Sequence, residues 1–174
     1  MKKQLRFHIR EASSEDKEII RQLVRYFWGE DIQVSFGMKF LVAELPAFVA
    51  VVDRHIAGFI SYYDFNSEAI LIVCAGVLPK YQGAGIGKAL IKAVEDKARS
   101  LSKRKVLVST TNDNLTALAF YQLLGFRIHE VASNVIAEKH GKVHIGLFGI
   151  PIYDEIRLYK DIETKHVAIS ELLG

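Results

Sequence analysis

Residues 77–88 have the sequence VLPKYQGAGIGK and join an apolar run to an amphipathic segment. The preceding run, Ala69–Val77, is apolar throughout, which is typical of a central strand covered on both faces. The following segment, Gly85–Leu101, has apolar residues at helical spacing and predicts a helix. Glycines at positions 83, 85 and 87 allow tight turns and a close backbone approach to a ligand, and the helix start adds unpaired N–H donors. The segment therefore predicts a phosphate site.

The spacing of this loop excludes two other phosphate-binding motifs. A P-loop requires glycine five residues before Gly87 and Ser or Thr after the lysine, but Gln82 and Ala89 occupy those positions. A dinucleotide-binding fingerprint requires glycine at the position of Lys88. That fingerprint also usually opens a series of βαβ units, whereas this loop follows a predicted meander of strands.

A second motif lies downstream of the loop. Asn114 directly precedes the predicted helix Leu115–Leu124 and suits its N-terminal capping position. Tyr121 lies within this helix, and Gly125-Phe126 follows it, where a glycine commonly ends a helix.

Taken together, the two motifs resemble those of the GNAT family of N-acetyltransferases. The family pattern Gln/Arg-x-x-Gly-x-Gly/Ala is matched by Gln82, Gly85 and Gly87, after the lead-in at residues 77–79. The element order along Leu5–Val131 agrees as well, so the resemblance covers about three quarters of the chain. It implies an α/β fold with a central, mostly antiparallel, twisted sheet and helices on both faces.

The resemblance also implies a co-substrate, acetyl-CoA, and roles for individual residues, with no metal. The loop N–H groups would hold the pyrophosphate, and the Val77 N–H would stabilise the oxyanion. Asn114 would hydrogen-bond the pantetheine, and Tyr121 would protonate the departing thiolate. The implied cofactor contacts are Val77, Leu78, Pro79, Gln82, Gly83, Ala84, Gly85, Ile86, Gly87, Lys88, Asn114 and Tyr121.

An alkyl amine is protonated near neutral pH, so a group of the protein or a water chain must accept its proton. Glu68, at the start of the central strand, is the candidate base, and the alternative is a solvent-facing turn residue. Glu30 and Asp31 would either hold a cationic acceptor or end a helix in solvent.

Other residues have weaker functional interpretations. Cys74 is expected in the core, not as a covalent nucleophile. His140 and His144 are four apart and would share a helix face, but no third metal ligand lies beside them. The aromatic residues of the N-terminal third are expected in the core, with a substrate cage as the alternative: Trp28, Phe36 and Phe40.

The remaining elements follow from periodicity and turn residues. Ser13 and Ser14 predict the start of a helix whose apolar stripe contains Ile19, Ile20, Leu23, Val24 and Phe27. Residues 30–45 predict a short second helix. The predicted strands are Leu5–Arg10, Ala47–Val52, Ile56–Phe65, Lys105–Thr110, Phe126–Val131, Val143–Ile152 and Glu155–Tyr159, and Thr164–Leu173 predicts a closing helix.

The 174 residues predict a single domain, with core motifs at 5–131 and an insertion and closing strands at 133–174. The insertion Ser133–Pro151 would cover the acceptor site or support a homodimer. A net charge of +3 argues against a nucleic-acid partner, and no apolar run is long enough for a membrane span or an export signal. The single cysteine permits no internal disulfide, so we expect a cytoplasmic protein.

These observations lead to one functional hypothesis with several alternatives. The chain is predicted to move an acetyl group from acetyl-CoA to a primary amine by direct attack in a ternary complex. The acceptor is open among a protein α-amine, a lysine, a polyamine and a small metabolite, and the acyl group is open as well. The alternative from another class is a non-catalytic acyl-CoA-binding or sensor module on the same fold.

Overall fold

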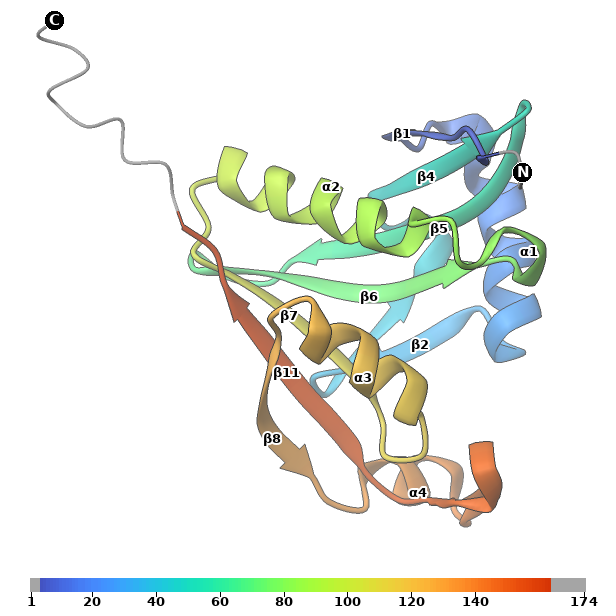
Figure 1. The fold of residues 1–174 in the computed structure, drawn as a ribbon. Coiled ribbons are helices and arrows are strands. Elements are labelled where there is room, and N and C mark those ends of the chain that lie inside the picture. Colours follow the sequence, from blue (N-terminus) through green and yellow to red (C-terminus); the bar gives the residue numbers. More distant parts are fainter. Residues whose placement is uncertain (1–3, 164–174) are drawn as a thin grey trace, which may run out of the picture.

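The structure is a computed structural model that describes residues 4–163 (Figure 1). The strands are β1 (His8–Glu11), β2 (Ile32–Ser35), β3 (Met38–Leu41), β4 (Ala47–Val52), β5 (His55–Asp64), β6 (Ala69–Val77), β7 (Lys105–Thr111), β8 (Arg127–Ala132), β9 (His144–Ile145), β10 (Pro151–Ile152) and β11 (Glu155–Asp161). The helices are α1 (Lys17–Trp28), α2 (Ile86–Ser100), α3 (Leu115–Leu123) and α4 (Val135–His140), with 3₁₀ turns at Ser14–Asp16, Val42–Glu44, Pro79–Tyr81 and Leu147–Gly149. The predicted helix Thr164–Leu173 lies outside the described residues.

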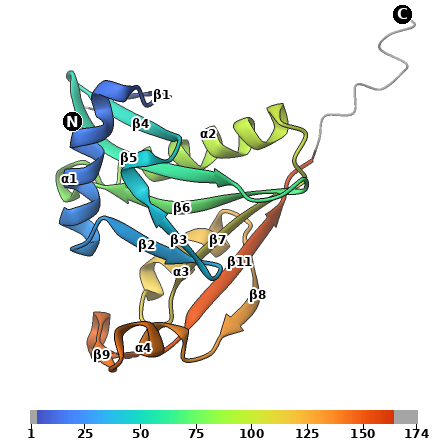
Figure 2. The same ribbon diagram turned by 180° about the vertical axis from the view of Figure 1, so that it is seen from behind.

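Seven strands form one sheet in the order β1-β4-β5-β6-β7-β11-β8. All neighbours in this sheet are antiparallel except β6 and β7, which are parallel. Helices α2 and α3 cover one face, and α1 with the small β2–β3 hairpin lies on the other (Figures 1 and 2). The predicted mostly antiparallel sheet between helices is confirmed.

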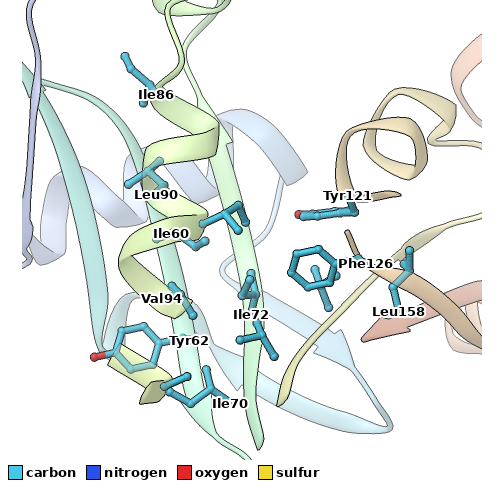
Figure 3. Packing of buried hydrophobic residues seen from close by; sticks show 14 of the residues in the cluster. Ile60, Tyr62, Ile70, Ile72, Ile86, Leu90, Val94, Tyr121, Phe126 and Leu158 are labelled. Atoms are coloured by element: carbon cyan, nitrogen blue, oxygen red, sulfur yellow. The ribbon is translucent and has the colours of Figure 1, made fainter. Parts of the chain in front are cut away.

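Each face of the sheet carries its own hydrophobic core. Under α2, the buried stripe that includes Leu90 and Val94 packs on Ile60 and Ile72 of the sheet (Figure 3). Full burial of an aliphatic side chain contributes about 1.5–3 kcal/mol, so this stripe fixes α2 on the sheet. Under α1, the predicted stripe is buried at Ile20, Leu23 and Val24, whereas Ile19 is exposed.

The parallel pair β6–β7 is paired only along its first half. Its register runs from Ala69 opposite Lys105 to Ile72 opposite Val108 and then stops, although both strands continue. On its other edge, β6 carries a bulge, because Ser61 faces Cys74 while the next residue, Tyr62, faces Ile72. A bulge bends its strand. The second half of β6 therefore leaves β7 and opens a gap in the sheet.

Two predicted elements near the gap were wrong. Residues 30–45 form the β2–β3 hairpin and a 3₁₀ turn instead of a helix, because Ile32 and Val34 alternate with polar residues and Gly37 supplies a left-handed turn position with φ +73°. The predicted strand Val143–Ile152 is broken into two-residue strands, β9 and β10, around a 3₁₀ turn that contains Gly149.

Other predictions were close to the structure. Strand β6 has the predicted bounds, α3 and β7 each differ from theirs by one residue at one end, and α2 is one residue shorter at both ends. The first strand starts later than expected, at His8 instead of Leu5, and ends at Glu11. Within residues 4–163, no helix is long and apolar enough to cross a membrane.

Candidate active site

The predicted phosphate loop runs from the end of β6 to the start of α2. After the 3₁₀ turn Pro79–Tyr81, Gly83 and Gly85 have φ of +81° and +89°, a conformation that other residues rarely adopt. Gly85 caps α2 without a side chain, so the first N–H groups of a 15-residue helix point out of the loop. A Cβ atom at Gly83 or Gly85 would meet nothing within 4 Å, so the surface that they present is open.

Side chains around the loop hold it in place and leave its outer face free. The Gln82 amide donates to the Val77 carbonyl at 2.9 Å and ties the loop back to β6. Gly87 allows α2 to approach α3, because a Cβ atom there would lie 3.3 Å from the Phe120 ring. Among residues 4–163, the Lys88 ammonium forms no ion pair and is exposed. These contacts leave the positive helix end accessible.

Backbone N–H groups of β6 face the gap in the sheet. The Cys74 N–H donates to the Ser61 hydroxyl at 3.2 Å, and the Leu78 N–H donates to the Ala57 carbonyl at 2.8 Å, so both point toward β5. Successive N–H groups along a strand point to opposite edges. Those of Ala75 and Val77 therefore point into the gap, where β7 no longer pairs with them.

Ligand pockets generally have volumes of roughly 300–1,000 Å³. The cavity at this gap measures 620 Å³. It is lined by the two parting strands, by α3, by the end of α1 with β2, and by the segment 136–152. The residues with functional groups that line it are Glu30, Gln33, Ser35, Ser109, Thr110, Thr111, Asp113, Asn114, Tyr121, Lys139, His140, His144 and Glu155.

Tyr121 projects from α3 into this cavity, with its hydroxyl pointing toward β6 (Figure 3). Its ring is 7% exposed and packs edge-on against Phe126, with the ring centroids 5.5 Å apart. Burial raises the pKa of Tyr121 well above its ordinary value, so the phenol stays protonated at neutral pH. No described residue hydrogen-bonds its hydroxyl, which is therefore free to donate to a ligand in the cavity.

Asn114 lies about two turns of helix away from Tyr121, at the start of α3. Its side-chain oxygen accepts the Ala117 N–H at 3.1 Å, as predicted for a helix cap. The amide nitrogen of the same side chain keeps two donors for a ligand in the cavity.

The family model described as "Acetyltransferase (GNAT) family" matches residues 8–126, which hold the loop, the gap and Tyr121. The chain belongs to the GNAT acetyltransferase family. This acetyltransferase is 30% identical over 152 residues to the protein YxbD of Bacillus subtilis (strain 168), which covers 84% of this chain and 94% of YxbD. It is 32% identical over 106 residues to an amino-acid acetyltransferase of Pseudomonas aeruginosa (strain UCBPP-PA14), over 59% of this chain and 24% of that protein.

Solved structures agree with the fold of this acetyltransferase. The IAA acetyltransferase from Bacillus cereus ATCC 14579 superposes with a TM-score of 0.73 at 23% identity, over 90% of this chain and 100% of that chain. A GNAT family acetyltransferase from Elizabethkingia anophelis, with acetyl-CoA bound, has a TM-score of 0.70 at 22% identity, over 90% of this chain and 98% of that chain.

The structure does not bring Glu68, the predicted base, to the cavity. Glu68 lies exposed in the turn before β6, where its carbonyl accepts the N–H groups of Arg104 and Lys105. The gap opens at the other end of β6, roughly 20 Å away at about 3.3 Å per residue.

The two acidic residues predicted near the acceptor have different places. Glu30 lines the cavity and pairs with Lys139 of the insertion at 3.3 Å, so this ion pair joins two walls of the mouth. Asp31 instead binds Arg25 through two short hydrogen bonds on the surface, and it does not line the cavity.

The three aromatic residues singled out in the sequence also have different surroundings. Trp28 lines the cavity and is 39% exposed, so a substrate-facing ring stays a prediction for this residue. Phe40 is buried against Tyr63, as expected of a core residue. Phe36 packs on Phe65 and under the Arg157 guanidinium.

Cys74 and the two histidines complete the predicted set. Burial raises the pKa of the Cys74 thiol to about 12, so it remains a thiol in the core. His140 and His144 both line the cavity, with ring centroids 5.2 Å apart, but the first ends α4 and the second lies in β9. Their predicted common helix face was therefore wrong. Within residues 4–163, no group of three His, Cys, Asp or Glu residues could hold a metal ion.

Proposed function

We propose that this acetyltransferase binds acetyl-CoA across the gap between β6 and β7 and transfers its acetyl group to a primary amine. The observation that carries the proposal is the alignment of three features along one path. The open N-terminus of α2 lies at one end, the free N–H groups of Ala75 and Val77 follow, and the Tyr121 hydroxyl faces them across the cavity.

The cofactor half of this path suits each part of acetyl-CoA. The pyrophosphate oxygens would accept hydrogen bonds from the N–H groups between Gln82 and Lys88, since helix N-termini favour anions. The pantetheine amides would add to the free edge of β6 as an extra strand does, with the Asn114 amide as a further donor. The acetyl-CoA-bound relative from Elizabethkingia anophelis has the same fold and supports this placement.

The chemistry would proceed by direct attack of the amine on the thioester carbonyl. As the carbonyl oxygen becomes negative, an N–H group of Val77 or Ala75 would stabilise it. In other enzymes one such donor stabilises the transition state by about 3 kcal/mol. The C–S bond then breaks, and the Tyr121 hydroxyl donates its proton to the thiolate. Burial raises the pKa of this phenol, so it carries the proton that this step needs at neutral pH.

An acetyl-transfer assay tests this function. The protein is incubated with acetyl-CoA and, separately, ethanolamine, putrescine, tyramine, L-lysine and a peptide with a free N-terminus. Release of the CoA thiol is followed together with the mass of the acetylated amine. The proposal expects thiol release that is matched by an N-acetylated product for at least one amine. Binding of acetyl-CoA without any product would instead support a non-catalytic acyl-CoA-binding module.

A further inference from the structure

A chain of hydrogen bonds outside the predicted motifs ends in a buried carboxylate. The hydroxyls of Ser35 and Ser109 lie 2.7 Å apart, and the Ser109 hydroxyl donates to Oε2 of Glu155 at 3.2 Å. The three residues come from β2, β7 and β11, and all three line the cavity. A buried polar chain of this kind needs an explanation beyond stability, because apolar side chains would fill the same space at lower cost.

The surroundings of Glu155 keep its carboxylate in one orientation. The residue is 3% exposed, its Oε2 also accepts the Phe36 N–H at 3.3 Å, and its Oε1 accepts the Arg157 guanidinium. Arg157 in turn binds the exposed Glu130 of β8 at 3.1 Å. The other charged or titratable groups at the same cavity are Glu30, Cys74, Asp113, Tyr121, Lys139, His140 and His144.

The chain lies on the opposite face of the sheet from Tyr121. Val108 and Leu158 belong to the core under α2 and α3, so their neighbours Ser109 and Arg157, and with them Glu155, face the other side. Ser35 reaches them from the hairpin on that side. A thioester in the gap would thus have a proton donor on the face of α3 and a proton acceptor on the face of α1.

The geometry points to Ser109 and Glu155 as the route by which the acceptor amine loses its proton. This inference rests on the proposed acetyl transfer. Ser109, the first residue of β7 beyond its pairing with β6, lies beside the gap. As the amine nitrogen bonds to the acetyl carbon, its N–H bond breaks and the proton goes to Ser109 Oγ. The original hydroxyl proton of Ser109 moves to Glu155 Oε2, and Glu155 later returns it to water. Ser35 holds the Ser109 hydroxyl in line.

The test compares the two carboxylates that bind Arg157. Glu155→Gln keeps the shape of the buried side chain but removes its capacity to take the proton, whereas Glu130→Gln removes the exposed partner. Near neutral pH, with the amine that gives the fastest product, kcat should fall about 100-fold in Glu155→Gln and stay within about twofold in Glu130→Gln. The affinity for acetyl-CoA, measured by calorimetry, should change by less than about twofold in both variants.

The pH profile separates proton transfer from a structural role. A primary amine with a pKa of about 10 loses its proton in solution as the pH rises. The defect of Glu155→Gln should therefore shrink at least about tenfold between neutral pH and about pH 10, where the free amine needs less help. A defect of equal size at every pH, or kcat equal to that of Glu130→Gln, would overturn the inference.

Two further measurements cover the remaining cases. If Glu155→Gln does not fold, Ser109→Ala breaks the hydrogen-bond chain and leaves the carboxylate in place. The same loss of kcat is expected for Ser109→Ala, and Ser109→Thr should restore it.

If no amine is acetylated, hydrolysis of acetyl-CoA by water still needs a proton acceptor. Slower hydrolysis in Glu155→Gln than in Glu130→Gln would then support the route while the amine acceptor fails, and equal hydrolysis would contradict the route.

Discussion

The two sides of the gap are built in different ways. The side proposed for the cofactor consists of backbone groups at the end of β6 and the start of α2, supported by a helix that is buried along one stripe. The side proposed for the acceptor consists of side chains from the β2–β3 hairpin, β7, β11 and the segment 135–152, where several apolar residues are exposed. Backbone donors recognise what all relatives share, whereas side chains on variable segments can differ with the acceptor.

Tyr121→Phe is expected to have the largest effect, because the phenol stands between the two sides. It removes the proposed proton donor but keeps the ring on Phe126. We expect kcat to fall about 100-fold while the acetyl-CoA affinity changes by less than about twofold. Steady-state kinetics and calorimetry measure the two quantities. Unchanged turnover would remove Tyr121 from the reaction.

A matched pair of glycine variants should distinguish the cofactor side from the acceptor side, with a smaller effect than that of Tyr121→Phe. Gly85 and Gly37 both have left-handed φ, at +89° and +73°, and a Cβ atom at either would meet nothing within 4 Å. Alanine at either position should therefore cost a similar free energy of unfolding, about 1 kcal/mol. Only Gly85→Ala should weaken acetyl-CoA binding, by about tenfold. Equal affinities in the two variants would show that the loop does not hold the cofactor.

Lys139→Ala should act on the acceptor side alone and more weakly. It removes a cation from the cavity mouth and frees Glu30, so a cationic amine is repelled less. The KM for such an amine should fall by about twofold to threefold, as for other half-exposed ion pairs, with no change in acetyl-CoA affinity. Lys92→Ala, which breaks the exposed pair with Asp96 on α2, is the control and should change neither value. A rise in KM for the amine would contradict the electrostatic argument.

Acid should lower the free energy of unfolding of the whole domain, and so affect both sides of the gap alike. Hydrogen bonds from Arg10 lower the pKa of Asp16 to about 2 from 3.8, at the start of α1. The charged form therefore contributes stability above about pH 4, which is lost as the pH falls toward 2. The shift corresponds to about 2 kcal/mol. Urea unfolding of wild type and Asp16→Asn should differ by this amount near neutral pH and converge near pH 2, whereas a constant difference would contradict the pKa shift.

The sequence predicts the cofactor side of the gap far better than the acceptor side, for a physical reason. The loop and α2 depend on neighbours in sequence, namely glycines beside a strand and an apolar stripe at helical spacing, so a short window contains the whole signal. The Ser35–Ser109–Glu155 chain joins residues 74 and 46 positions apart, and no local pattern marks it. Only the fold brings these polar side chains together.

Glu68 shows the same limit in one residue. The sequence correctly places it before the central strand, but it does not reveal which end of that strand leaves its neighbour. The bulge opposite Ser61 and Tyr62 decides that, and it lies in the pairing between strands, not in the apolar run itself. The hairpin at residues 32–41 was missed because its alternation is short and its turn, Phe36-Gly37, has no common hairpin signature.

A calorimetric titration tests the central claim most directly. Acetyl-CoA is titrated into the full chain and into Gly85→Ala and Gly37→Ala, with NADH as a second pyrophosphate ligand. The account predicts saturable binding of one acetyl-CoA per chain in wild type and in Gly37→Ala, about tenfold weaker binding in Gly85→Ala, and no binding of NADH. No heat of binding at sub-millimolar acetyl-CoA, or equal binding of NADH, would contradict it.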